Sequence, residues 1–159
     1  MNLQKGASPG RLLLAVLFAG LFLEGLFFVV QGRFNIDEGL HLNAGRLLYA
    51  HGRMLYSDFP FSQGPGAAYF YGIASAHFEN PILVGRLFSL CMASICVAGM
   101  AAFVNRMVGR MGVLLVLLWT SICFPAIWAF TQIRTEPVAI TLTMLATIAF
   151  WFRKGAALR

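Results

Sequence analysis

Charged residues are scarce in this chain. Of its 159 residues, 11% are charged, whereas a soluble domain carries about 25%. Hydrophobic residues make up 59% of the chain, and the mean hydropathy is +0.76. Because several long apolar runs accompany this composition, the sequence is typical of a membrane protein rather than of a soluble domain.

Cysteines are few, and sequence repeats are absent. Cys91, Cys96 and Cys123 lie inside apolar runs, and none has CxxC or metal-ligand spacing. The pattern favours small buried side chains over a disulfide framework or a metal site. No internal repeat and no low-complexity segment occurs in the sequence.

The positive charge of the chain does not predict nucleic-acid binding. The formal net charge is +6, but the basic residues form no stripe with interleaved aromatic residues. Membrane orientation explains them better, because cytoplasmic loops carry an excess of lysine and arginine. We therefore expect the lipid bilayer as a partner and no nucleic acid.

Four apolar segments predict an all-α membrane protein with a single membrane domain over residues 1–159. A helix of about 20 apolar residues crosses a bilayer, and the predicted spans cover residues 12–30, 82–104, 111–130 and 137–152. Pro125 is expected to kink the third span, and Pro137 suits the first turn of the fourth. Glu24 is an acid inside the first span, and Arg86 is its candidate partner in the helix bundle.

Residues 67–79 form a further apolar segment that is too short to span a membrane. A helix of this length covers about 20 Å, against about 30 Å of hydrocarbon. If it lies at the outer interface, the loop at residues 105–110 and both termini are cytoplasmic, as the positive-inside rule requires. The chain is then a multi-pass protein of the cell membrane, such as a bacterial inner membrane, with an extracytoplasmic loop at residues 31–81.

The outer loop begins with a predicted amphipathic helix that rests on the membrane surface. Asn35 and Glu38 have the spacing of a capping box, and Gly52 is a natural stop. The predicted apolar face, from which Asp37, His41 and Gly45 point away, consists of Ile36, Leu40, Ala44, Leu47 and Leu48. Asp37 and His41 could share a divalent metal, although two ligands are too few to define a site.

Several motifs of this loop resemble one protein family. They are D-E-G-x-x-L-N-A-G-R-L-L, G-x-x-x-Y-x-D-F-x-x-x-Q-G-P and Y-x-Y-G, at Asp37–Leu48, Gly52–Pro65 and Tyr69–Gly72. Gly85–Leu87 and Arg134–Pro137 continue the pattern, which covers roughly residues 10–152. In these features the chain is similar to the GT-C superfamily of membrane glycosyltransferases, which includes protein mannosyltransferases and the aminoarabinose transferases of lipid A.

The resemblance implies an enzyme that transfers a sugar from a polyprenyl-phosphate donor to an acceptor hydroxyl at the outer face. It assigns the general base to Asp37, with Glu136 as a second acid of the site and Glu38 beside the base. The phosphate leaving group needs cationic donors. The candidate substrate-binding residues are His41, Arg46, Arg53, Asp58, Arg86 and Arg134. No cofactor is implied.

Other interpretations stay open. Members of the superfamily carry many more spans, so we expect the chain to be the N-terminal part of a larger enzyme. Further transmembrane segments or a partner subunit would complete it. The alternative is a non-catalytic multispan membrane protein, either an assembly partner or a degenerate remnant with the same fold. A transporter fragment is less favoured, because the sequence contains no inverted repeat and no spans broken by glycine and proline.

Overall fold

The computed structural model describes residues 9–157, with side chains described except at positions 9, 11, 124–126, 128 and 152–157. This part of the chain is helical, and its single β feature is an isolated bridge between Leu55 and Phe59. The prediction of an all-α fold is confirmed. The helices are α1 (Pro9–Gln31), α2 (Ile36–His51), α3 (Pro65–His77), α4 (Pro81–Met107), α5 (Arg110–Ile122), α6 (Phe124–Thr131) and α7 (Thr135–Ala157).

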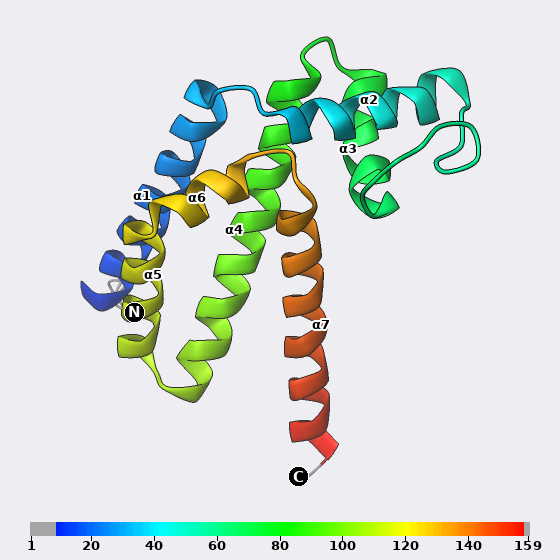
Figure 1. The fold of residues 1–159 in the computed structure, drawn as a ribbon. Helices are drawn as coiled ribbons and strands as arrows, with labels where there is room; N and C mark the ends of the chain where they lie inside the picture. The colour runs from blue at the N-terminus through cyan, green and yellow to red at the C-terminus, as the bar shows by residue number, and fades with distance from the viewer. Residues whose placement is uncertain (1–8, 158–159) are drawn as a thin grey trace, which may run out of the picture.

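The helices form a bundle, and a pair of helices lies across one end of it (Figure 1). α1, α4, α5 and α7 run along the bundle, whereas α2 and α3 lie across its upper end in Figure 1. α4 is the central helix, since it contacts each of the other six. α1 begins and α7 ends at the opposite end from α2 and α3 (Figure 1).

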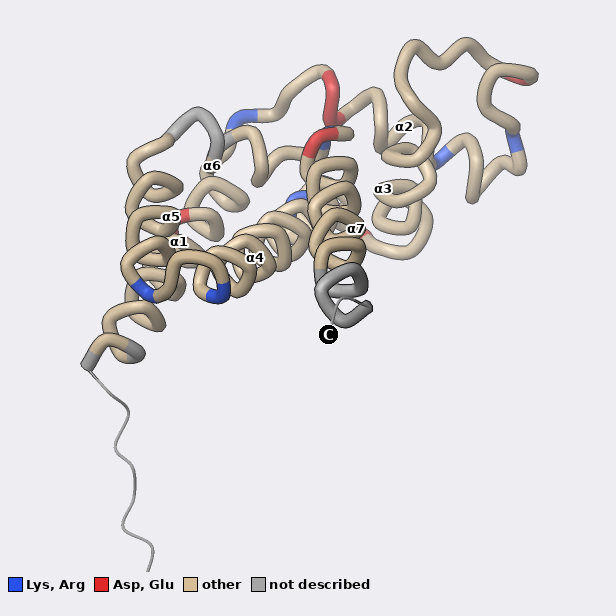
Figure 2. Tube along the Cα trace, turned by 90° about the horizontal axis from the view of Figure 1, so that it is seen from below, with Lys and Arg blue, Asp and Glu red and all other residues tan. Residues whose placement is uncertain are grey.

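In the described part of the chain, two helices are long and apolar enough to cross a membrane. They are Leu12–Gln31 and Pro81–Met107, and the shorter apolar helices cover Arg110–Ile122 and Thr135–Trp151. Charged residues are few along these helices and lie mostly near their ends (Figure 2), with Glu24 of α1 as an exception. The first, second and fourth predicted segments therefore correspond to α1, α4 and α7, and two of the helices are candidate membrane spans.

The third predicted segment, residues 111–130, is interrupted rather than kinked. Cys123 leaves the helical conformation at ψ 67°, and it separates α5 from α6. Pro125, in the first turn of α6, explains the break: proline has no N–H to donate to the carbonyl four residues earlier, and its ring clashes with that carbonyl. α6 slants from the end of α5 across the bundle towards α4 and α2 (Figure 1).

The ends of α2 confirm the predicted cap and stop, whereas the placement of its apolar face on the membrane surface stays a prediction. Both hydrogen bonds of the capping box are present, and Gly52 ends the helix in the left-handed region at φ 62°. The buried residues of α2 are Glu38, His41, Leu42, Ala44 and Gly45, while Ile36 is 85% exposed. The Glu38 side chain turns inward because it finds partners there, in Arg86 and the backbone of Ile133.

Two glycines set the packing of α2 against α3. A Cβ atom on Gly45 would collide with the backbone of Gly72, so the two helices touch at their main chains. Ser75 donates a hydrogen bond to the carbonyl of Leu42 at 2.8 Å. The hydroxyl of Tyr49 donates to the carbonyl of Tyr69 at 3.1 Å. These contacts hold the α2–α3 pair together and position the start of α2 over α4.

Candidate functional site

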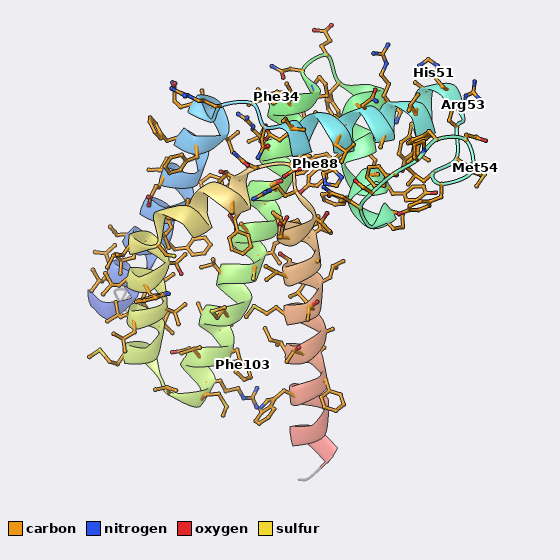
Figure 3. The ribbon with its side chains drawn as sticks, viewed as in Figure 1. Phe34, His51, Arg53, Met54, Phe88 and Phe103 are labelled. Carbon is orange, nitrogen blue, oxygen red and sulfur yellow. The ribbon has the colours of Figure 1, made fainter. Side chains whose placement is uncertain are left out.

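Polar side chains gather where the first half of α2 meets α4 and the connection between α6 and α7. Phe34, just before α2, and Phe88, on α4, mark the region in Figure 3. We call this group the polar layer; it consists of Asn35, Asp37, Glu38, His41, Gln63, Tyr71, Arg86, Ser89, Gln132, Arg134, Thr135 and Glu136.

A buried ion pair between Glu38 and Arg86 lies at the centre of the polar layer. The guanidinium donates two hydrogen bonds of 2.7 Å, one to each carboxylate oxygen. The carboxylate also accepts from the backbone N–H groups of Asn35 at 3.0 Å and Ile133 at 3.3 Å. With its side chain 0% exposed and its oxygens fully engaged, Glu38 holds α2 against α4 and has no oxygen free to contact a ligand.

Arg86 also hydrogen-bonds to backbone carbonyls at the C-terminal end of α1. Its terminal nitrogens donate to the carbonyls of Val29 at 3.2 Å, Gly32 at 2.7 Å and Arg33 at 2.9 Å. These carbonyls have no helical partner after the end of α1, so the guanidinium satisfies them. Arg86 is therefore not the partner of Glu24: its long side chain reaches the α1 terminus and the acid of α2 instead.

A chain of hydrogen bonds forms the floor of the polar layer. Tyr71 and Ser89 bond through their hydroxyl oxygens at 2.7 Å, and Ser89 also lies 2.7 Å from the carbonyl of Gln132. The Asn35 amide donates to the Gln132 side chain at 3.1 Å. Burial raises the pKa of Tyr71 to about 12, so its hydroxyl stays protonated. The sequence did not single out Ser89 and Gln132 as site residues. Their one distinguishing feature in the sequence is that each is a polar residue next to apolar ones.

Asp37 and Arg134 form the accessible edge of the polar layer. Their side chains pair at 2.9 Å and are 34% and 26% exposed, respectively. Thr135 donates to the Gln63 side chain at 3.2 Å, which ties the α2–α3 loop to the start of α7. Glu136 follows in the first turn of α7 and is exposed. The edge therefore presents a carboxylate and a guanidinium together at the surface.

His41 lies beneath this edge and is 0% exposed. Its ring lies 5.9 Å from that of Phe61 and 6.2 Å from that of Tyr71, measured between centroids. Neither ring nitrogen makes a hydrogen bond of good geometry to the described residues, but the Gln63 side chain lies near enough to act on the ring as a weak partner. Burial lowers the pKa of His41 below 6.5, and the carboxylate of Asp37 opposes the shift. The imidazole is therefore neutral at physiological pH.

The structure brings six of the nine predicted site residues together and leaves three outside. Asp37, Glu38, His41, Arg86, Arg134 and Glu136 belong to the polar layer. Arg46 and Arg53 are exposed, and Arg53 lies at the far end of α2 from Phe34 (Figure 3). Asp58 accepts from the backbone N–H of Met54 at 2.7 Å and holds a local turn.

The described residues include no group of three or more histidines, cysteines, aspartates and glutamates that could hold a metal ion. Asp37 and His41 therefore have no third ligand of these types beside them. A metal would need ligands from outside this set.

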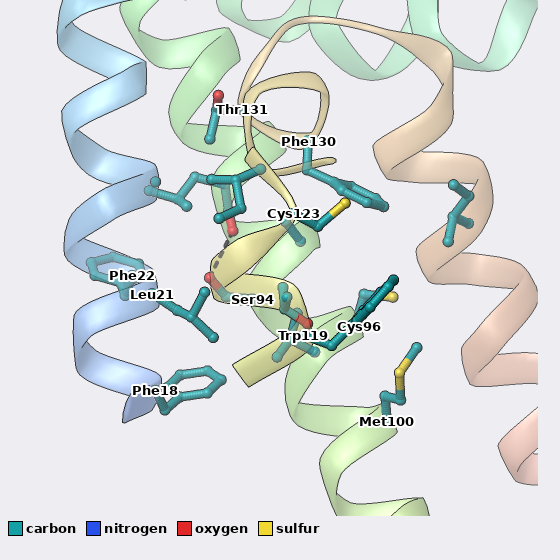
Figure 4. A pocket seen from close by; sticks show the side chains of 17 residues that line it. Phe18, Leu21, Phe22, Ser94, Cys96, Met100, Trp119, Cys123, Phe130 and Thr131 are labelled. Atoms are coloured by element: carbon teal, nitrogen blue, oxygen red, sulfur yellow. Dashed lines mark hydrogen bonds between the residues drawn. The ribbon is translucent and has the colours of Figure 1, made fainter. Parts of the chain in front are cut away.

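An apolar cavity of about 200 Å³ lies within the bundle beside the polar layer. It is lined by residues of α1, α4, α5, α6 and α7 and is partly open to the outside, with aromatic side chains from Phe18, Phe22, Trp119 and Phe130 (Figure 4). Thr131, at its upper end in Figure 4, directly precedes Gln132 of the polar layer. Apolar volume and polar groups thus adjoin at the same end of the bundle.

Fold and site together define a helical protein with two candidate membrane helices and a polar layer at one end of its bundle. Comparison with protein-family models, curated proteins and solved structures finds no match. The chemistry of the polar layer is therefore the basis for assigning a function.

Proposed function

We propose that the chain is a glycosyltransferase, or the N-terminal catalytic part of one, that uses a polyprenyl-phosphate sugar as donor. The observation that carries the proposal is the accessible pair of Asp37 and Arg134 at the end of an apolar bundle. The carboxylate can take the proton that the acceptor hydroxyl loses, and the guanidinium beside it can bind the phosphate leaving group.

The reaction follows from these two groups. The acceptor hydroxyl gives its proton to Asp37 as its oxygen bonds to the anomeric carbon of the sugar. The bond between that carbon and the phosphate oxygen breaks, and its electron pair leaves with the polyprenyl phosphate. Arg134 stabilises this leaving group. When the donor binds, its phosphate competes for Arg134 and frees Asp37 to act as the base.

The same proposal places the chain in a cell membrane. α1, α4, the α5–α6 pair and α7 are the four crossings, and α2 and α3 lie at the outer interface. Both termini are then cytoplasmic, and the isoprenoid tail lies in lipid beside the apolar cavity. Further transmembrane segments or a partner subunit would complete the walls around a lipid donor, because binding pockets enclose most of a ligand's surface.

The test compares the two adjacent acids. Asp37→Asn keeps the size of the side chain but removes the proton acceptor, so the initial transfer rate should fall by roughly 10²–10⁴-fold with the melting temperature unchanged. Glu38→Gln leaves Arg86 buried without its counter-charge and should lower the free energy of unfolding by about 3–5 kcal/mol. Transfer is measured in membranes from a radiolabelled polyprenyl-phosphate hexose at matched protein levels.

Arg53→Gln is the control, because Arg53 is exposed and lies outside the polar layer. It should change neither rate nor stability. An Asp37→Asn variant as active as wild type would remove the general base from the proposal. If wild-type membranes transfer no more sugar than membranes without the chain, the non-catalytic alternative is favoured.

A further inference from the structure

We propose that His41 is the residue that recognises the transferred sugar, through a hydrogen bond between its neutral imidazole and a hydroxyl of the saccharide. The inference rests on the proposed function and deepens it, since it separates recognition of the sugar from recognition of the phosphate. His41 is a positioning and specificity residue in this proposal and takes no proton in the reaction.

The first observation concerns the hydrogen bonding of a buried polar ring. His41 is 0% exposed, and neither Nδ1 nor Nε2 makes a hydrogen bond of good geometry to the described residues; the Gln63 side chain is only a weak partner beside the ring. Buried polar atoms in folded proteins nearly always have partners, so an exception of this kind calls for a ligand or an ordered water. Two such nitrogens on one ring offer a donor and an acceptor together.

The second observation is the surroundings of the ring. Phe61 and Tyr71 form aromatic walls at 5.9 and 6.2 Å. Asp37 precedes His41 by one helical turn, and Gln63, Glu136 and Arg134 lie close enough to influence its protonation. Ligand sites typically combine aromatic walls with a few convergent polar groups, as this one does.

The charge state of the ring selects the chemistry of its partner. Burial lowers the pKa of His41; Asp37, Gln63 and Glu136 oppose this shift, and Arg134 adds to it. A neutral imidazole donates one hydrogen bond and accepts one, as a hydroxyl does, whereas an anion requires donors alone. Arg134 therefore suits the phosphate, and His41 suits an uncharged hydroxyl of the sugar.

The two aromatic neighbours of His41, Tyr71 and Phe61, belong to different parts of the fold. Tyr71 is anchored to α4 by its 2.7 Å hydrogen bond to Ser89. Phe61 belongs to the irregular connection between α2 and α3, in which Tyr56 has a positive φ of 67°. Phe61 packs with Ala44, Leu55 and Ala68 in a buried cluster, so in this proposal a sugar reaches His41 only when that cluster opens.

The test measures binding of two synthetic short-chain lipids to the purified full chain in detergent: a polyprenyl phosphate and its phospho-mannose counterpart. The wild type should bind the sugar-bearing lipid at least about tenfold more tightly than the bare phosphate, because a site built to hydrogen-bond a hydroxyl rejects a ligand that lacks it. In His41→Phe this ratio should fall to about one, with affinity for the bare phosphate unchanged.

Two further variants complete the test. His41→Gln, which keeps a donor and an acceptor, should retain part of the sugar preference, and His41→Met replaces the phenylalanine variant if that one does not fold. His51→Gln is the control, because His51 is exposed at the far end of α2 (Figure 3). An unchanged ratio in the apolar variants overturns the role of His41 while leaving the proposed function intact. A wild type that binds neither lipid overturns both.

Discussion

At the scale of single residues, the two adjacent acids of α2 have separate environments. Consecutive residues of an α-helix are about 100° apart around its axis, so one carboxylate points into the bundle while the other points to its edge. Glu38 is 0% exposed and bonds to Arg86, whereas Asp37 is 34% exposed and pairs with Arg134. Glu38 is engaged in packing α2 against α4, and the proposed function therefore assigns the general base to Asp37.

The buried histidine predicts a dependence of stability on pH. The pKa of His41 is lowered below 6.5 in the folded chain, so the unfolded chain binds more protons just below that pH. Its contribution is therefore complete above pH 6.5, and stability falls as the pH decreases below it. The loss is about 1.4 kcal/mol for each unit by which the folded pKa is lowered.

Melting temperatures of the purified chain at about pH 7.5 and about pH 5.5 test this prediction. His41→Phe should lose less stability on acidification than the wild type, because it removes the group that must become charged. His51→Phe, at an exposed position, should behave as the wild type does. Equal losses in the wild type and His41→Phe would show that His41 does not titrate on unfolding.

At the scale of elements, the contact between α2 and α3 decides where the polar layer forms. Gly45 and Gly72 bring the two main chains together, and Tyr49 covers Gly72 with ring atoms 2.7 Å from where its Cβ would be. This close approach directs the buried face of α2 towards α3 and α4. Residues Glu38 and His41 share that face with Gly45, so they turn inward with it.

Gly45→Ala should therefore destabilise the α2–α3 pair. The added methyl group meets the backbone of Gly72, which cannot move as a side chain can. We expect a loss of about 1–3 kcal/mol in the free energy of unfolding, the usual cost of overpacking. Thermal melting measures the loss.

Gly20→Ala is the matched control on α1, where a Cβ would meet no atom within 4 Å. It should keep or raise the melting temperature, because alanine is favoured over glycine inside a helix by about 1 kcal/mol. Equal stability of the Gly45 and Gly20 variants would mean that α2 and α3 separate easily.

At the scale of the whole molecule, the proposal makes the α2–α3 end extracytoplasmic and the α4–α5 connection cytoplasmic. A membrane-impermeant maleimide added to intact cells should label Ser57→Cys but not Asn105→Cys, both of which are exposed positions. The background lacks the native cysteines, each replaced by alanine. Labelling of Asn105→Cys and protection of Ser57→Cys would reverse the orientation.

Local features of the fold could be predicted from the sequence. The apolar runs that became α1, α4 and α7, the Asn35–Glu38 capping box and the Gly52 stop were all readable in advance. They depend on interactions between residues a few positions apart, so neighbours in the sequence are sufficient to specify them. The break at Cys123 was predicted only in part. Pro125 predicted a kink in the third span, whereas the structure has an interruption between two helices.

Only the tertiary structure decided which faces and which charges meet. The partner of Glu38 is 48 residues away and that of Asp37 is 97 residues away, so both pairs depend on how α4 and the α6–α7 connection lie against α2. The apolar periodicity of α2 could not select its buried face, because lipid and protein interior attract the same side chains. Helix packing and buried polar pairing made that choice, and they enclosed His41 without a hydrogen bond of good geometry to the described residues.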